Sequence, residues 1–305
     1  MYKFHRPEPL VVKLGDGAGF ELRKKAAEYI NLNENHTGAE RANKERQGFG
    51  ALAEIVIRKH LGMQEFNPEG HPLGYDILLP SGVKVDVKCR GGSLPFKEVY
   101  ESDDGIAREA KHNFYARQLD DERLDTDIYL MTHLETPSLK SLPGTNRQRK
   151  WTLYICGWVS KERVAREGVY LPRGSLTEQG RTWFTYRGQE IEFYNRNLNG
   201  LGSFDDLLTI DPSDVIADKS KKGDLNLTSV DAIRIAYDLA GRGIITNDQV
   251  QFVEKELGLT KPVKTILHAN QYHHLLEWLK DKEQLTGNEL VRAEAIISKE
   301  IYSGL

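Results

Sequence analysis

The segment Gly74–Cys89 constrains the fold more than any other part of the chain. Two apolar runs flank Pro80–Gly82, and a short loop with glycine between such runs is typical of a β-hairpin. A three-residue loop and a symmetric register would place Asp76 directly opposite Asp86, with Cβ atoms about 5 Å apart. Because side chains alternate along a strand, Asp86 and Lys88 share one face. The hairpin therefore predicts two carboxylates and an ammonium group together at the edge of an apolar sheet.

A second carboxylate-bearing element precedes the hairpin. The range Glu40–Gly62 has apolar residues at helical spacing, which predicts a long helix, and Glu54 falls at the edge of its apolar stripe. From there the Glu54 carboxylate can reach toward the following sheet. Two plainer interpretations stay open. Asp86 and Lys88 could be the solvated face of the hairpin, and Glu54 could form an i,i+4 ion pair with Arg58, worth about 0.2–0.5 kcal/mol.

Glu54 on a helix, Asp76 after a glycine at a strand start, and Asp86-Val87-Lys88 on the next strand resemble the PD-(D/E)XK nuclease superfamily, in its phage and bacterial form. The order of the following segments is similar to that family as well. A candidate helix at 106–119 is followed by strand-like runs at 127–132 and 151–159. The resemblance covers residues 40–211. It implies an α/β fold with a restriction-endonuclease-like αβββαβ core around a central mixed sheet.

The resemblance also implies a chemistry. Asp76, Asp86 and the main-chain carbonyl of Val87 would hold Mg²⁺, with Mn²⁺ as a substitute, because hard divalent ions prefer oxygen ligands. Glu54 would act on the ion through water or hold a second ion. Lys88 would position the attacking water and offset charge on the phosphate. The implied catalytic set is therefore Glu54, Asp76, Asp86 and Lys88.

This set implies a metal-dependent DNA endonuclease in phage or bacterial DNA processing, restriction or recombination, with duplex DNA as the partner. Two alternatives remain open. One is a structure-specific or RNA-directed nuclease of the same fold, and the other is an inactive protein of that fold that binds nucleic acid or serves in assembly.

The charge balance limits how nucleic acid could be bound. The 305 residues carry a formal net charge of −3, so phosphate contacts would have to be local rather than spread over the protein. The candidates for a basic groove are Lys84, Arg90, Lys111 and Arg117. A solvated surface charge is the alternative for each of them.

Cysteine usage and hydropathy predict the compartment. Cys89 and Cys156 lie inside strand-like runs, which favours buried free thiols in a reducing environment. No run of 18 apolar residues is present, so we expect no membrane partner and a cytoplasmic protein.

The chain divides by composition into four parts. Residues 1–38 are predicted to form an irregular arm and a short helix at 20–31, and residues 39–211 the nuclease-like domain. A polar stretch at 212–224 is typical of a linker. Residues 225–305 predict a small bundle of four helices, at 228–240, 246–258, 263–282 and 286–301.

The role of the bundle is open between DNA or partner recognition and a stabilising or dimerising appendage, so a homodimer remains an alternative. Its histidines, His268, His273 and His274, are interpreted as surface or core residues, because neighbouring positions on a helix do not face one way and no Cys or Glu completes a ligand set in sequence.

Overall fold

The computed structural model describes residues 7–14, 25, 44–64, 74–92, 111–120, 124–135, 151–171, 173–174, 176–179, 182–185, 188–223, 225, 227, 229–258 and 269–301. Apart from Lys25, the helix expected at 20–31 lies outside these residues, as does the first part of the helix expected at 106–119.

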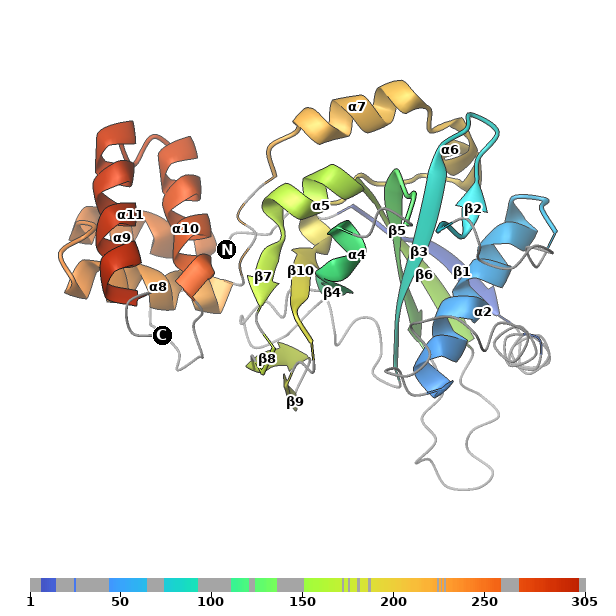
Figure 1. Cartoon of the computed structure of the whole chain (residues 1–305), viewed down its shortest axis with the longest axis horizontal. Helices are drawn as coiled ribbons and strands as arrows, with labels where there is room; N and C mark the ends of the chain where they lie inside the picture. Colours follow the sequence, from blue (N-terminus) through green and yellow to red (C-terminus); the bar gives the residue numbers. More distant parts are fainter. Residues whose placement is uncertain are drawn as a thin grey trace.

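A five-stranded sheet lies in the right-hand part of the molecule in Figure 1, with strand order β1-β6-β5-β3-β2. Strand β3 runs parallel to β5, and the other neighbours are antiparallel, which confirms an α/β fold with a mixed sheet. The restriction-endonuclease-like identity of the fold stays a prediction. The strands are β1 Leu10–Leu14, β2 Ile77–Leu78, β3 Lys84–Gly92, β5 Ile128–Glu135 and β6 Trp151–Ser160.

Helix α2 (Lys44–His60) covers one face of this sheet, as the apolar spacing predicted. Its residues 51–58 are all buried. Leu52 and Val56 belong to one apolar cluster with Val85 and Val87 of β3. The odd-numbered side chains of β3 therefore face α2, and the even-numbered ones, which include Asp86 and Lys88, face the other way.

The opposite face carries helix α5 and a smaller antiparallel sheet, β4-β10-β7. Met131 of β5 packs in one cluster with Val164 of α5 and Phe193 of β10. These elements are β4 Lys111–Tyr115, α4 Arg117–Asp120, α5 Lys161–Glu167, β7 Val169–Leu171 and β10 Glu190–Tyr194. A further pair, β8 Leu176–Gln179 and β9 Thr182–Thr185, forms a two-stranded sheet, and η2 spans Asn195–Asn197.

Two sequence predictions are wrong in these layers. The helix expected at 106–119 is replaced over residues 111–115 by strand β4, which pairs with β10, and within the described part of that range helical structure begins only at Arg117, in the four-residue α4. The N-terminal arm is not irregular throughout, since β1 pairs along its length with β6. In both cases the partner strand is distant in sequence, so local pattern carries no signal for it.

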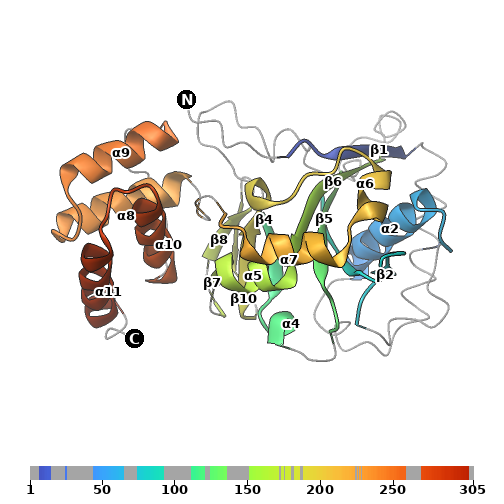
Figure 2. The same ribbon diagram turned by 90° about the horizontal axis from the view of Figure 1, so that it is seen from above.

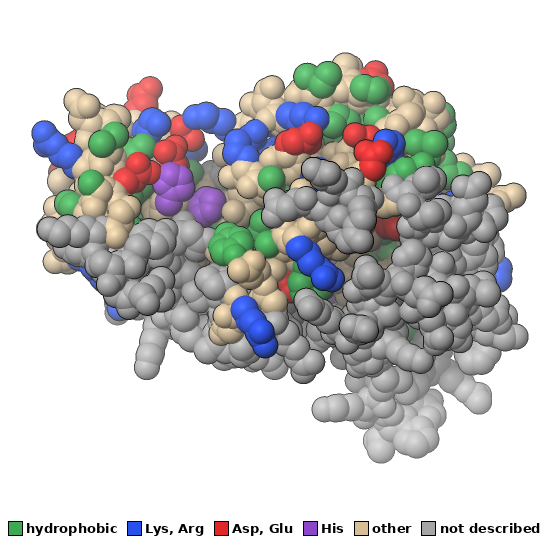
Figure 3. Space-filling view, viewed as in Figure 1, with side chains coloured by type: hydrophobic (Ala, Val, Ile, Leu, Met, Phe, Trp, Pro, Cys, Tyr) green, Lys and Arg blue, Asp and Glu red, His purple; other side chains and the backbone are tan. Residues whose placement is uncertain are grey.

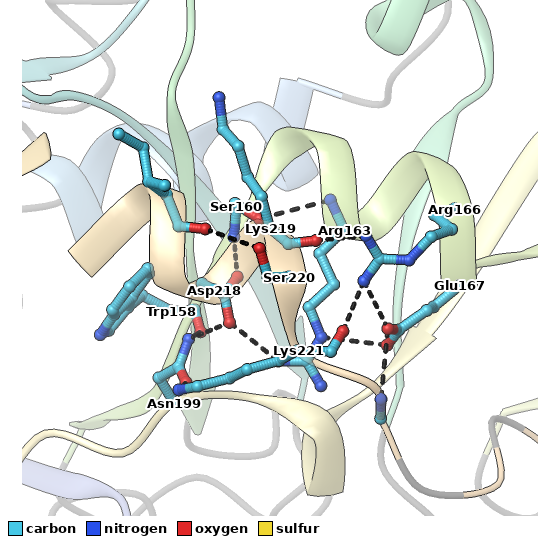
Figure 4. A network of polar contacts seen from close by, with 12 residues as sticks. Trp158, Ser160, Arg163, Arg166, Glu167, Asn199, Asp218, Lys219, Ser220 and Lys221 are labelled. Atoms are coloured by element: carbon cyan, nitrogen blue, oxygen red, sulfur yellow. Dashed lines mark hydrogen bonds and ion pairs between the residues drawn. The ribbon is translucent and has the colours of Figure 1, made fainter. Parts of the chain in front are cut away.

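The polar stretch interpreted as a linker is folded onto the core. Helices α6 (Phe204–Thr209) and α7 (Pro212–Ser220) precede the bundle, and α7 lies along α5 (Figures 1 and 2). Asp218 of α7 is fully buried and accepts hydrogen bonds from Ser160 N, Arg163 Nη1 and Asn199 Nδ2, at 2.8, 2.9 and 2.7 Å (Figure 4). The linker interpretation therefore does not hold for residues 212–220.

The four C-terminal helices agree with the sequence prediction where the structure describes them; the start of the third, at 263–268, lies outside the described residues. They are α8 Ser229–Gly241, α9 Asn247–Leu257, α10 Ala269–Asp281 and α11 Gly287–Ile301. Two similar hairpins make up the bundle: Gly243 and Glu283 take up positive φ (72° and 58°) in the two turns, and Thr246 and Thr286 each accept a hydrogen bond from the backbone N–H three residues on.

The core of the bundle extends into the small sheet. Val169, Leu171 and Tyr194 of that sheet lie in the same apolar cluster as Leu275 and Leu279 of α10. The small sheet thus contributes to the contact between the bundle and the rest of the described chain, as does the ion pair between Lys222 and Asp281. Among the described residues, no helix is both long and apolar enough to cross a membrane.

Candidate metal centre at the β2–β3 hairpin

The hairpin has the loop and the register that the sequence predicted. Leu79 N–H donates to the Val83 carbonyl at 2.9 Å, which leaves a three-residue loop, and Gly82 has a positive φ of 87°. Ile77 pairs with Val85. At Asp76 the ladder departs from this register, because Asp76 N–H donates to the carbonyl of Val85 at 2.9 Å, although Val85 already pairs with Ile77. A position of Asp76 directly opposite Asp86 stays a prediction.

Asp86 and Lys88 form an ion pair on the face of the sheet away from α2. Lys88 Nζ lies 2.7 Å from Asp86 Oδ2, and the two side chains are 17% and 14% exposed. The same ammonium lies 5.4 Å from the centre of the Tyr129 ring on the neighbouring strand β5. Burial and the nearby Asp86 carboxylate raise the pKa of the Tyr129 hydroxyl, so the ring is a neutral neighbour of the pair.

Asp76 lies at the end of β2, beside this pair. Its Oδ2 accepts a hydrogen bond from Val87 N–H at 2.7 Å. Because the N–H and C=O of one strand residue project to the same side, the Val87 carbonyl is directed toward the Asp76 side of β3. The Asp76 carboxylate thus takes the position that a backbone carbonyl of β2 would have if the ladder continued.

The electrostatics at Asp76 are unfavourable to its charge. Burial, then the nearby Asp86 and Glu54 carboxylates, raise the pKa of Asp76 well above its usual value, and the Lys88 charge and the Val87 N–H offset only part of this effect. A carboxylate that is pushed toward its neutral form by two other carboxylates is the arrangement that a bound cation relieves.

Glu54 approaches from the other side of the sheet, on α2. It is 3% exposed, and its Oε1 accepts a hydrogen bond from Arg58 Nε at 2.9 Å. The i,i+4 ion pair that the sequence left as an alternative is therefore formed, and it is buried. Arg58 also donates to the main-chain carbonyl of Asp76, so it connects α2 with the start of β2.

The donor set fits a hard divalent ion. Asp76 and Asp86 lie near each other, since after burial the Asp86 charge is the main cause of the raised pKa of Asp76, and the Val87 carbonyl lies on the Asp76 side of β3. All three offer oxygen, the ligand atom that Mg²⁺ and Mn²⁺ prefer. Lys88 pairs with Asp86, and its charge also lowers the pKa of Asp76, but burial and the two carboxylates outweigh this effect, which a bound cation would counteract.

The basic residues expected to line a nucleic-acid groove differ in their exposure and in their partners. Lys111 is buried, and its Nζ lies 2.7 Å from Glu192 Oε2, so it does not present its charge to a phosphate. The prediction for Lys111 is wrong, because β4 places this side chain inside the small sheet. Arg90 is half-buried and donates to the Lys111 carbonyl at 3.4 Å.

The other two candidates reach the surface. Lys84 pairs with Asp125, whose side chain is 62% exposed, and Arg117 is exposed beside the ring of Tyr115. On the face shown in Figure 3, basic and acidic side chains are interspersed over the described surface. Both residues remain predictions as nucleic-acid contacts.

Sequence reasoning missed two features of the described residues. It named Arg58 only as a partner of Glu54 and not as a link to Asp76, which depends on a contact 18 residues away. It also found no Glu beside the bundle histidines. In the structure, ligand atoms of His273, Glu277 and Glu294 lie within 4.8 Å of one another, but this group is on the surface, where His273 is 55% exposed and already pairs with Glu294.

Comparison with known proteins adds no family assignment: no protein-family model, no curated protein and no solved structure matches the chain.

Proposed function

We propose that this protein is a metal-dependent nuclease that hydrolyses phosphodiester bonds, with DNA as the substrate and internal cleavage as the mode. One observation carries the proposal: the Asp76 carboxylate accepts a hydrogen bond from the N–H of Val87, the residue between Asp86 and Lys88, and Lys88 pairs with Asp86 on the same strand. These are the groups that metal-assisted hydrolysis of a phosphodiester requires, in one place.

Each residue has a role that follows from its surroundings. Asp76, Asp86 and the Val87 carbonyl would hold Mg²⁺, which when bound supplies Lewis acidity and orients the phosphate. Lys88 is the only cation that pairs with Asp86 among the described contacts, so its ammonium can orient water and offset negative charge on the phosphate oxygens. The Tyr129 ring shields one side of this ammonium.

The alternatives concern the substrate and not the site. A structure-specific or RNA-directed nuclease would use the same four groups, namely Asp76, Asp86, the Val87 carbonyl and Lys88. An inactive protein of the same architecture would bind nucleic acid without cutting it. The buried carboxylates and the Lys88–Asp86 pair favour activity over binding alone. Without a metal ion such a group of carboxylates repels phosphate, so a protein that only binds nucleic acid gains nothing from it.

The test is cleavage by the full chain of supercoiled plasmid, linear duplex, single-stranded DNA and RNA, with Mg²⁺, Mn²⁺ or EDTA. We expect a metal-dependent cut in the closed circular plasmid. Asp86→Asn should lower the rate by more than about 100-fold, since even residues that only support metal ligands contribute 10–100-fold.

Asp281→Asn is the control, because Asp281 forms an exposed ion pair with Lys222 in the bundle region. Equal cleavage by the wild type and Asp86→Asn would overturn the proposal, as would the absence of cleavage on all four substrates. Cleavage of RNA alone would support the first alternative.

A further inference from the structure

Arg58 makes three contacts that converge on the candidate metal centre. Its guanidinium donates to Glu54 Oε1 at 2.9 Å, to the Gln64 carbonyl at 3.4 Å and to the Asp76 carbonyl. These acceptors belong to α2, to the segment after it and to the residue that precedes β2. Arg58 is only 8% exposed, so this arrangement lies inside the protein.

The arginine and Glu54 depend on each other. A guanidinium stays charged at any physiological pH, and its rigid fork of donors suits several fixed acceptors at once. Glu54 is 3% exposed and has this cation at hydrogen-bonding distance. If Glu54 turned away to bind a metal ion, Arg58 would be left as a buried charge without its carboxylate, which is unfavourable.

The two faces of the sheet also separate Glu54 from Asp86. Glu54 comes from α2, on the side of Val85 and Val87, whereas Asp86 points to the side of Tyr129. Asp76 is at the sheet edge, where its backbone contacts Arg58 and its carboxylate contacts Val87 N–H. Glu54 and Asp86 therefore approach Asp76 from opposite faces of the sheet, and burial first, then the charges of Asp86 and Glu54, raise the pKa of Asp76.

We propose that Arg58 is a positioning residue which holds Glu54 away from the metal and fixes the backbone of Asp76, so that the centre takes one divalent ion, on Asp76 and Asp86. This inference rests on the proposed function. It changes the role expected for Glu54 from metal ligand or holder of a second ion to the carboxylate partner of Arg58.

The experiment counts Mn²⁺ bound by the full chain, from the free-ion signal in electron paramagnetic resonance. We expect one ion per wild-type chain. Glu54→Gln keeps an oxygen for Arg58, so it should still bind one ion, with affinity within about threefold of the wild type. Asp86→Asn should bind none at concentrations that saturate the wild type. Arg58→Lys keeps the charge but not the fork, and should weaken binding by about 10-fold or more.

Glu167→Gln is the matched control, because Glu167 accepts from Arg163 Nε at 3.0 Å in the same i,i+4 geometry, outside the centre. It should bind Mn²⁺ as the wild type does. If Arg58→Lys does not fold by circular dichroism, the wild-type count and Glu54→Gln still decide the matter.

Two ions per wild-type chain would overturn the inference, and so would a loss of affinity in Glu54→Gln as large as that in Asp86→Asn. Both results leave the proposed function intact. A wild-type chain that binds no Mn²⁺ would overturn the proposed function and this inference together.

Discussion

At the scale of single residues, the candidate centre places carboxylates close together, which is unfavourable to the stability of the folded protein. Asp76 is surrounded by Asp86 and Glu54, and its pKa is raised by burial first and by these carboxylates next. Asp86 pairs with Lys88, and Glu54 pairs with Arg58. A bound ion would add positive charge where the raised pKa of Asp76 shows that negative charge is unfavourable.

This arrangement predicts how stability depends on pH without metal. Because the folded-state pKa of Asp76 is raised, the native protein binds this proton more tightly than the unfolded chain, whose Asp pKa is about 3.9. Stability is then lost as pH rises from about 4 through the folded-state pKa. Asp76→Asn removes the effect, since its amide oxygen can still accept from Val87 N–H.

We expect Asp76→Asn to melt a few degrees higher than the wild type at pH 7 in EDTA, where about 1 kcal/mol corresponds to 2–4 °C in a large domain. The difference should shrink toward pH 4. Melting temperatures from differential scanning fluorimetry over pH 4–8 provide the test, with Asp281→Asn as the control. A lower melting temperature for Asp76→Asn at pH 7 would contradict the charge argument.

At the scale of elements, two glycines of the site region make a matched pair. Gly82 closes the hairpin with φ of 87°, a conformation that other residues adopt only with strain, whereas Gly50 lies within α2. Among the described residues, an added Cβ would meet nothing within 4 Å at either position. The difference between the two sites is therefore one of backbone conformation.

Gly82→Ala should lower the free energy of unfolding by about 1–2 kcal/mol, and Gly50→Ala should raise it by about 0.5–1 kcal/mol, because alanine favours the helix. Urea denaturation followed by circular dichroism measures both. Equal stability of the two variants would show that the Gly82 turn is not under the strain inferred from its φ.

At the scale of the whole molecule, Asp218 connects α7 with α5 and β6 from a position without solvent contact. Burial alone would raise the pKa of its carboxyl, but hydrogen bonds from Ser160 and Asn199 and the charge of Arg163 outweigh burial and hold the pKa low. Its contribution is therefore present at neutral pH and is lost as pH falls below the ordinary Asp value.

Asp218→Ala should destabilise the protein at pH 7 by about 3–5 kcal/mol, because removing one partner of a buried ion pair leaves the other uncompensated. Asp281→Ala breaks the exposed pair with Lys222 and should cost no more than about 1 kcal/mol. Urea midpoints at pH 7 compare the two. A cost below 1 kcal/mol for Asp218→Ala would mean that α7 is not anchored through this residue.

The sequence by itself determined the elements whose signals are local. The glycine-containing loop and the alternation beside it predicted the hairpin, and its three-residue loop and the pairing of Ile77 with Val85 are present, whereas Asp76 departs from that register. Helical spacing predicted α2, and cap residues such as Thr246 predicted the helices of the bundle. Side-chain period and turn chemistry act between near neighbours in the chain, so they can be read without the fold.

The tertiary structure alone decided where distant segments meet. Strand β4 formed instead of a helix because β10 pairs with it, and this pairing buried Lys111 against Glu192. The fold also brought the backbone of Asp76 to Arg58. Such contacts depend on burial and on partners far along the chain, which no local pattern encodes. The sequence thus predicted which groups could form a metal centre, and the fold determined the contacts that each of them makes.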